Sequence, residues 1–355
     1  MISLEELLQE MVQRNASDLH IAAASPPRLR VDGKLSPMDR DVLTPDDTRK
    51  LMYGILDEDQ VARFEKNWEL DLSFGIEGLG RFRVNVFLQR GAVGAVMRII
   101  PTKIKTFEDL GLPRKVCEEL CAKPKGLILV TGATGSGKST TLAAMIDYIN
   151  QNEHGHIITI EDPIEFAHHN KTCLINQREI GSDTHGFKEA LRSVLRQDPD
   201  SVLIGEMRDM ETIEAALTIA ETGHLTFGTL HTSDCVQTMN RVVDVFPAHQ
   251  QSQIRTQLSF VLEGVFCQQL LPRAAGKGRV LVSEIMMANA AVRALIREDK
   301  AHQIYSVIQT SGKMGMKTMN QSLADLVKAN AIKMETALEH SGDPDDLRRT
   351  LSKPV

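Results

Sequence analysis

The sequence predicts an α/β protein in which a small α+β domain precedes a larger domain built on a mainly parallel sheet. Near the start, residues 70–74 and 82–88 alternate apolar and polar side chains, as expected for antiparallel strands with one face on a core. Beyond residue 126, short continuous apolar runs alternate with helical patterns, which is typical of parallel strands covered on both faces. The length of 355 residues suits two domains.

The composition excludes several classes of protein. Hydrophobic residues make up 42% of the chain and charged residues 25%, as in ordinary globular domains. A net charge of −6 gives no basic field that would draw the molecule onto nucleic acid, so no nucleic-acid partner is expected. No uncharged apolar run reaches the roughly 18 residues of a spanning helix, and residues 1–6 lack the features of a secretory signal. We therefore expect a cytoplasmic protein, in which the five scattered cysteines are reduced.

The first domain is expected to open with a helix and continue with strands. Apolar residues at 4–11 have the spacing of an amphipathic helix. The strands at 70–74 and 82–88 are joined by a glycine-rich hairpin connection, and a further strand is expected at 93–99. The next residues contain two prolines and little periodicity, which indicates a linker. The predicted boundaries are 1–100 for the first domain, 101–113 for the linker and 114–355 for the second domain.

The second domain is expected to alternate buried strands with helices. Helical patterns occur at 142–149 and 213–220, and from about residue 246 the chain is expected to be mostly helical, with one apolar stripe over 254–265. This order indicates a core of the kind that binds nucleotides. The predicted strands are 127–130, 157–160, 202–204 and 225–230.

A glycine-rich motif of the form GxxxxGK[ST] lies between the first of these strands and the helix that follows. Glycines let the loop curl with its backbone N–H groups inward, and the helix directs its positive dipole end to the same point. Lys138 would contact the β and γ phosphates of ATP, and the Ser139 hydroxyl would be the metal ligand for Mg²⁺. The predicted phosphate cradle consists of Gly132, Ala133, Thr134, Gly135, Ser136, Gly137, Lys138, Ser139 and Thr140.

Polar residues follow the other strands at the edge where ligands of parallel sheets bind. Glu206 is the candidate catalytic carboxylate, although Gly205 stands where an aspartate usually precedes it. Glu161 and Glu165 follow the strand at 157–160, and either is also a possible helix cap. His231 follows its strand and is either a core histidine or a partner of the site. His224 precedes the strand and is expected either to be structural or to lie at the opposite edge.

Arginines are the remaining candidates, because they offset the charge that develops in phosphoryl transfer. Arg81 and Arg83 share the polar face of a first-domain strand, where they either contact solvent or act on the nucleotide of a neighbouring subunit. Arg192 and Arg196 form a second candidate patch, and Arg208 is a third candidate.

Four ordered segments together resemble the ATPases of type II secretion and type IV pili, and most closely their pilus retraction members. The C-terminal string AVRALIRE at 291–298 is similar to a helix motif of the retraction proteins. The larger N-terminal region and four-cysteine zinc module of extension and secretion members are missing from this sequence. The four segments are GATGSGKST at 132–140, TIEDPIE at 159–165, LRQDPDSVLIGEMRD at 195–209 and ETGHLTFGTLHT at 221–232.

The resemblance implies an N-terminal PAS-like domain and a RecA-like ATPase domain, assembled as a hexameric ring. It implies an enzyme that hydrolyses ATP with Mg²⁺ and drives pilus retraction and twitching motility, docked at the inner face of the cytoplasmic membrane on a platform protein of the pilus. Catalytic roles carried over from the family fall on Glu161, Glu165, Glu206, His224, His231, Arg81, Arg83 and Arg196.

Other functions stay open at this point. Membership of the retraction group also fits an accessory paralogue, and the missing aspartate before Glu206 keeps open a regulator that binds ATP but hydrolyses it weakly. An extension or secretion ATPase is a further alternative. A ring that moves nucleic acid is disfavoured by the acidic charge and by an aromatic content of only 4%, because base-stacking side chains are scarce.

Overall fold

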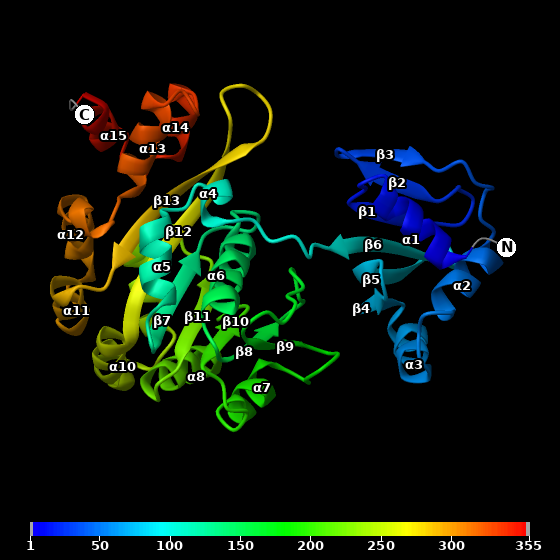
Figure 1. Ribbon diagram of the computed structural model, residues 1–355, viewed down its shortest axis with the longest axis horizontal. Coiled ribbons are helices and arrows are strands. Elements are labelled where there is room, and N and C mark those ends of the chain that lie inside the picture. The colour runs from blue at the N-terminus through cyan, green and yellow to red at the C-terminus, as the bar shows by residue number, and fades with distance from the viewer. Residues whose placement is uncertain (1–2, 353–355) are drawn as a thin grey trace. The chain divides into compact units, whose positions relative to one another are not determined.

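A computed structural model of the chain describes residues 3–352. The chain divides into two compact units, Met1–Thr102 and Lys103–Val355, and each is described by itself (Figure 1). The first two and last three residues of the predicted domains lie outside the described residues. Among the described helices, none is both long enough and apolar enough to cross a membrane.

The first unit is a six-stranded antiparallel sheet with the strand order β3-β2-β1-β6-β5-β4. The expected alternation is confirmed on β5, where Phe82, Val84 and Val86 are buried while Arg83 is exposed. Helix α1 begins after Ser3, whose side chain accepts the backbone N–H of Glu6. The elements are α1 Leu4–Gln13, β1 Asp18–Ile21, β2 Arg28–Val31, β3 Lys34–Pro37, α2 Pro45–Tyr53, α3 Glu58–Asn67, β4 Glu69–Ile76, β5 Gly80–Gln89 and β6 Ala92–Ile100.

The stretch at 101–113, which the sequence predicts to be a linker, contains a short helix in the structure. Helix α4 (Phe107–Leu110) is capped by Thr106, whose side chain accepts the Asp109 backbone N–H and whose own backbone N–H donates to the Asp109 carboxylate. Phe107 and Leu112 are buried in the core of the second unit. The later part of this stretch therefore packs as part of the second unit, because its few apolar residues find a core there.

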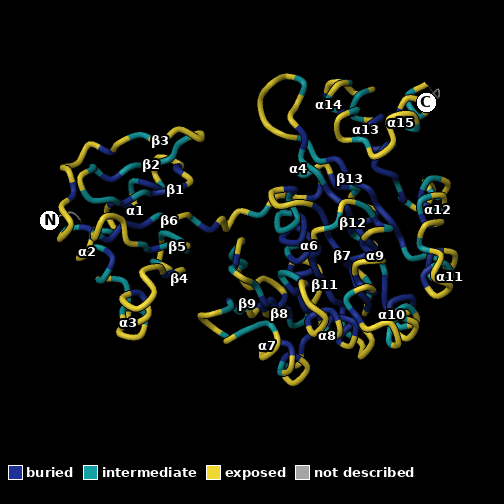
Figure 2. The backbone as a smooth tube through the Cα atoms, turned by 180° about the vertical axis from the view of Figure 1, so that it is seen from behind, coloured by how far each residue is buried: buried dark blue, intermediate teal, exposed yellow. Residues whose placement is uncertain are grey.

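The second unit is built on a seven-stranded sheet with the order β13-β12-β7-β11-β10-β8-β9. All neighbouring pairs are parallel except β12 with β13. Strands β7, β10 and β11 are buried along their whole length, so both faces of the sheet are covered, as predicted (Figure 2). The strands are β7 Gly126–Thr131, β8 His156–Glu161, β9 Leu174–Glu179, β10 Ser201–Ile204, β11 Leu225–Leu230, β12 Leu262–Pro272 and β13 Arg279–Met287.

Helices connect these strands. All five cysteines are buried within this unit as free thiols. The helices up to the end of the parallel region are α5 Arg114–Cys121, α6 Lys138–Asn152, α7 Phe187–Val194, α8 Met210–Glu221, α9 Cys235–Asp244 and α10 Ala248–Val261.

The prediction of a mostly helical chain from residue 246 is wrong for β12 and β13. Helix α10 ends at Val261, and Leu262 begins a strand that pairs with β7. Leu262 and Val265 are three residues apart, which is also the spacing of a helix face. They belong to a strand that is buried on both faces, and the apolar run of such a strand does not alternate with polar residues. The remaining helical portion is confirmed as α11 Ala290–Arg297, α12 Ile304–Thr310, α13 Met319–Lys328, α14 Met334–His340 and α15 Pro344–Ser352.

Candidate nucleotide-binding site

The predicted cradle is a tight loop between β7 and α6. Gly132 has φ of +138°, and a Cβ atom there would lie 2.3 Å from the Gln268 carbonyl oxygen on β12. Gly137 has φ of +94° and is the residue at which α6 begins. Side chains at these two positions would be strained or would collide, so glycine is required for the loop to take this shape. The N-terminus of the 15-residue helix α6 therefore opens onto the loop, as anion binding requires.

Lys138 lies with its charge inside the loop. Its Nζ donates to the carbonyl oxygens of Gly132 (2.8 Å) and Ala133 (3.2 Å). Burial lowers the pKa of Lys138, against the opposing attraction of Glu206 and Glu165. The ammonium group is thus held within the cradle, where it can contact phosphate oxygens.

Two hydroxyl groups in this region have no protein partner among the described residues. The Oγ1 of Thr131, at the end of β7, and the Oγ of Ser136, in the loop, are both buried without a hydrogen bond. Buried hydroxyls are normally paired, so these two groups fit a site that is completed by a polar ligand. Ser139 and Thr140 lie in the first turn of α6 and are partly exposed, as a metal-binding hydroxyl must be.

The carboxyl ends of three parallel strands meet beside the cradle. Ile204 of β10 is in register with Ile160 of β8 and with Gly228 of β11, and Leu230 is in register with Thr131 of β7. The sheet therefore brings together the residues that follow these strands. They are Glu161, Glu206 and His231, which confirms that these predicted site residues share one edge of the sheet with the cradle.

Glu206 is the centre of a small charged group. Its Oε1 accepts from His231 Nε2 at 2.9 Å and forms an ion pair with Arg208. Desolvation alone would raise the pKa of Glu206, but the hydrogen bonds and charges of Arg208 and His231 hold it below its ordinary value. Because the His231 side chain is 44% exposed and contacts this carboxylate, it is a partner of the site rather than a core histidine.

The missing aspartate before Glu206 has a steric cause. A Cβ atom on Gly205 would lie 3.1 Å from both the Glu161 Cα and the Ile160 carbonyl oxygen of the neighbouring strand. Gly205 is also fixed through its backbone, since its N–H donates to Ile160 (2.8 Å) and its carbonyl accepts from Thr229 Oγ1 (2.6 Å). An aspartate side chain would force β8 and β10 apart at this point.

Glu161 is held at the end of β8 by neighbouring polar side chains. Its Oε1 accepts from Thr159 Oγ1 (2.6 Å) and from Gln177 Nε2 (3.2 Å). Burial raises the pKa of Glu161, although both hydrogen bonds oppose the shift. Glu165, which is exposed, lies in the loop that follows.

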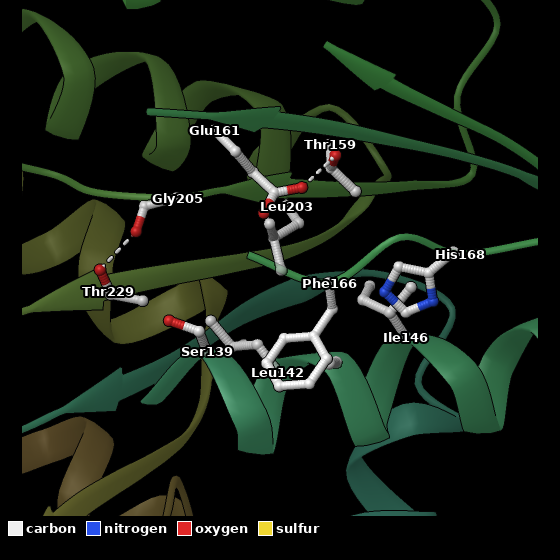
Figure 3. A pocket seen from close by; sticks show the side chains of 11 residues that line it. Ser139, Leu142, Ile146, Thr159, Glu161, Phe166, His168, Leu203, Gly205 and Thr229 are labelled. Carbon is white, nitrogen blue, oxygen red and sulfur yellow. Dashed lines mark hydrogen bonds between the residues drawn. The ribbon is translucent and has the colours of Figure 1, made fainter. Parts of the chain in front are cut away.

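A small cavity of about 30 Å³ lies beside Glu161 (Figure 3). Figure 3 shows Glu161 on one side of it, Ser139 and Leu142 of α6 on the other, and Phe166 and His168 from the loop after β8. The cavity thus joins the first turn of α6 to the end of β8. Its polar lining includes Ser139, Thr159, Glu161, His168 and Thr229.

Four predicted residues lie elsewhere. His224 precedes β11 at the amino end, opposite His231, and its Nδ1 lies 3.1 Å from the Ile219 carbonyl oxygen. Arg196 is exposed in the turn between α7 and β10. Arg81 and Arg83 lie on β5 of the first unit, where Arg81 Nη2 donates to Ser73 Oγ at 2.8 Å. Within one chain, the sheet does not bring His224 to the edge that carries Glu206.

Sequence reasoning missed two glutamines near the site. Gln268 of β12 donates to Thr141 Oγ1 at 2.9 Å, and both side chains are buried beneath the cradle. Gln177 of β9 contacts Glu161. Neither could be found from a motif, because Gln268 falls in a segment predicted as helix and Gln177 falls in a polar edge strand with no strong pattern.

The chain is similar to ATPases of type IV pili over nearly its whole length. Over 97% of its length the chain is 50% identical to the whole of the type IV pilus retraction ATPase PilT of Pseudomonas aeruginosa. It is 42% identical to the type IV pilus ATPase PilU of the same organism, over 98% of this chain and 91% of PilU. A crystal structure of the pilus retraction motor PilT with bound ADP matches with a TM-score of 0.92 and 51% identity, over 98% of this chain and 100% of that one.

These similarities extend through the cradle and the strand ends that surround it. The predicted resemblance to pilus retraction ATPases is therefore confirmed, and the α/β fold matches that of a solved PilT structure. Residues 1–337 match the family T2SSE, described as type II/IV secretion system protein. The chain belongs to this family.

Proposed function

We propose that this chain is an ATP-hydrolysing motor that drives retraction of type IV pili and hence twitching motility. The observation that carries the proposal is the meeting of Glu161, Glu206 and His231 at the sheet edge beside the cradle at 132–139. The 50% identity to a retraction ATPase supports the same function.

In this proposal the cradle binds the triphosphate of ATP. Backbone N–H groups of residues 132–139 and the N-terminus of α6 surround the phosphates, and Lys138 contacts the β and γ phosphates. Ser139 holds Mg²⁺, which when bound neutralises charge on the phosphate oxygens. The unpartnered hydroxyls of Thr131 and Ser136 fit such a polar ligand.

Glu206 is the proposed catalytic base. Its carboxylate orients a water molecule in line with the γ phosphate and accepts a proton as the water oxygen bonds to phosphorus, which releases ADP and phosphate. His231 and Arg208 orient this carboxylate and keep it ionised. Glu161 lines the cavity beside the first turn of α6, and the charge of Glu165 acts on Lys138, so both carboxyl groups would help to place water and metal.

The remaining predicted residues suit a site shared between subunits. We infer a PAS-like first domain (1–100) and a RecA-like second domain (114–355) that assemble into a hexameric ring. His224 and Arg196 lie away from the cradle of their own chain, and Arg81 and Arg83 lie in the other unit, so each would act at a subunit boundary. On ATP binding, the second domain of one subunit would close onto the first domain of its neighbour. The ring would dock at the cytoplasmic side of the inner membrane, and this motion would act on a platform protein of the pilus.

Two substitutions test the assignment of the site. Glu206→Gln should retain ATP binding but release phosphate at least about a hundredfold more slowly, because the base is lost while the cradle is intact. Lys138→Ala should lose nucleotide binding. Binding of a fluorescent ATP analogue and phosphate release by the purified chain measure both effects. Unchanged turnover in Glu206→Gln would remove Glu206 from the mechanism.

An accessory or weakly hydrolysing role is the second candidate, because glycine stands at position 205 where an aspartate usually precedes the catalytic glutamate, and the chain is also 42% identical to a second type IV pilus ATPase, PilU. A weakly hydrolysing regulator would bind ATP as tightly as the motor but would show little phosphate release even as an assembled ring. Solution mass with and without an ATP analogue, combined with the ATPase assay, separates the two functions.

A further inference from the structure

The side-chain amide of Gln177 makes three hydrogen bonds beside the proposed catalytic site. Its Nε2 donates to Glu161 Oε1 (3.2 Å) and to the Phe166 carbonyl oxygen (2.9 Å), and its Oε1 accepts the His168 backbone N–H (2.8 Å). A primary amide offers two donors and an acceptor in one plane, whereas a glutamate at this position would have no donor. The side chain therefore ties a carboxylate and a loop to one point on β9.

The strand register explains why Gln177 reaches Glu161. Gln177 of β9 lies directly beside Thr159 of β8, and Glu161 is two residues further along β8 on the same face. Thr159 and Gln177 both donate to the same carboxylate oxygen. The orientation of Glu161 is thus set from two strands together.

The loop residues that Gln177 holds also cover the cavity beside Glu161. Phe166 and His168 line this cavity together with Ser139 and Leu142 of α6, and Figure 3 shows the Phe166 ring beside Leu142. If Gln177 lost its three hydrogen bonds, the loop and the carboxylate would be free to move independently. The cavity between Glu161 and the start of α6 would then lose its defined shape.

We propose that Gln177 is a positioning residue that fixes the Glu161 carboxylate and the loop 166–168 relative to the first turn of α6. This inference rests on the proposed ATPase function. In this proposal Gln177 acts through Glu161 rather than on the nucleotide itself, so its effect should fall on turnover and not on ATP binding.

The test is a double-mutant cycle on the full chain, with phosphate release as the measurement. Gln177→Met keeps the side-chain length but removes every polar contact, and should lower kcat about tenfold with a change in KM below about twofold. In a Glu161→Gln background the same substitution should change kcat by less than about twofold, because its partner is already altered. Equal losses in both backgrounds, or a rise in KM alone, would overturn the proposal.

Two further variants keep the result unambiguous. Gln151→Met is the matched control, because Gln151 is an exposed glutamine of α6 bonded to Asp147 outside the site, and it should leave kcat unchanged. If Gln177→Met fails to fold, Thr159→Val removes the other donor to the same oxygen, and Thr159→Ser restores it. Loss of kcat in the valine variant with recovery in the serine variant supports the proposal; equal rates in the two contradict it.

Phosphate release by the wild-type chain distinguishes failure of this inference from failure of the proposed ATPase function. A wild-type chain that binds ATP but releases no phosphate would overturn the proposed ATPase and the inference together. An active wild type with Gln177→Met at the same rate would overturn the role of Gln177 alone.

Discussion

Gly205 shows how one residue limits the chemistry of its neighbours. Its missing side chain lets β10 approach the backbone of β8, and this places Glu206 and Glu161 at adjacent strand ends. A Cβ atom at position 205 would already crowd the backbone of β8. The acidic groups that this pairing places side by side are Glu161 and Glu206, at the ends of β8 and β10.

A substitution at this glycine should reduce stability. Gly205→Ala should lower the free energy of unfolding by about 1 to 3 kcal/mol, because the new Cβ atom meets backbone atoms at 3.1 Å that cannot rotate away. Urea denaturation measures the change. Gly312→Ala is the control, since nothing lies within 4 Å of its Cβ position, and an equal loss there would contradict the steric explanation.

His168 makes stability depend on pH. Burial lowers the pKa of His168 from 6.5 to about 4, and its Nδ1 has no hydrogen-bond partner among the described residues. The unfolded chain takes up a proton below about pH 6.5 while the folded chain does not, so the free energy of unfolding falls as the pH falls through this window.

The histidine contribution can be isolated by substitution. Between about pH 7.5 and about pH 5, the wild type should lose about 2 kcal/mol more stability than His168→Gln, because the variant has no proton to take up. Denaturant unfolding at both pH values measures the difference. His169→Gln, which alters an exposed histidine next to it, should follow the wild type; a matching slope in His168→Gln would refute the prediction.

The site could be predicted from sequence where residues follow strands. Glu161, Glu206 and His231 each come directly after an apolar run, and parallel strands carry such residues to one edge. The hydrogen-bond partners of these residues could not be predicted from the sequence, because the Glu206 contact with His231 depends on the register of β10 and β11. Gln177 and Gln268 come from other strands, whose pairing no local pattern reveals.

Among the elements, helix α11 contacts the end of α10 through Arg293. Arg293 donates from Nη1 to the carbonyl oxygens of Ser259 and Phe260 (2.8 Å each), in the last turn of α10, and from Nη2 to Glu263 (2.7 Å). These carbonyl groups have no partner within their own helix. The string at 291–298 that resembles retraction proteins therefore includes the residue that caps α10 where β12 begins.

Loss of Arg293 should destabilise the contact between α10 and α11. Arg293→Met should lower the free energy of unfolding by about 2 to 4 kcal/mol, since it leaves two helix carbonyls without their donor and the partly buried Glu263 with only the longer ion pair to Lys123. Thermal and urea unfolding measure it. Arg348→Met, which removes an exposed pair with Asp345, should change stability by no more than about 0.5 kcal/mol. If the two variants lost equal stability, the capping role would be wrong.

The same region marks the limit of sequence prediction for elements. Four strands of the parallel region, β7, β8, β10 and β11, are predicted because their apolar runs are bounded by turns and by polar residues, whereas the polar edge strand β9 is missed. Strand β12 follows α10 with no intervening loop, at Val261 and Leu262, so its first apolar residues continue the spacing of the helix. Only pairing with β7 and β13 distinguishes it as a strand.

In the whole molecule, the two units have separate cores. Among the described residues, the first unit buries one cluster, which runs from Leu7 to Met97, and the second buries two, which begin at Phe107 and Leu271. No buried cluster is shared, so each unit has what it needs to fold alone.

A fragment that begins at Lys103 should therefore fold and bind nucleotide by itself. It contains the complete cradle and both of its core clusters. It should hydrolyse ATP more slowly than the full chain, because it lacks Arg81 and Arg83. Circular dichroism, analogue binding and phosphate release measure these properties. A fragment with full activity would show that the first unit contributes nothing to catalysis.

The burial of every cysteine has a practical consequence for studying the motor in action. Burial raises the pKa of the Cys117 thiol to about 12, so that it stays protonated and unreactive near neutral pH, and the other four are also buried. A cysteine engineered onto the surface of each unit can then accept a fluorophore selectively. Energy transfer between two such dyes would record the separation of the units through each round of turnover, in a chain whose native thiols need not be removed.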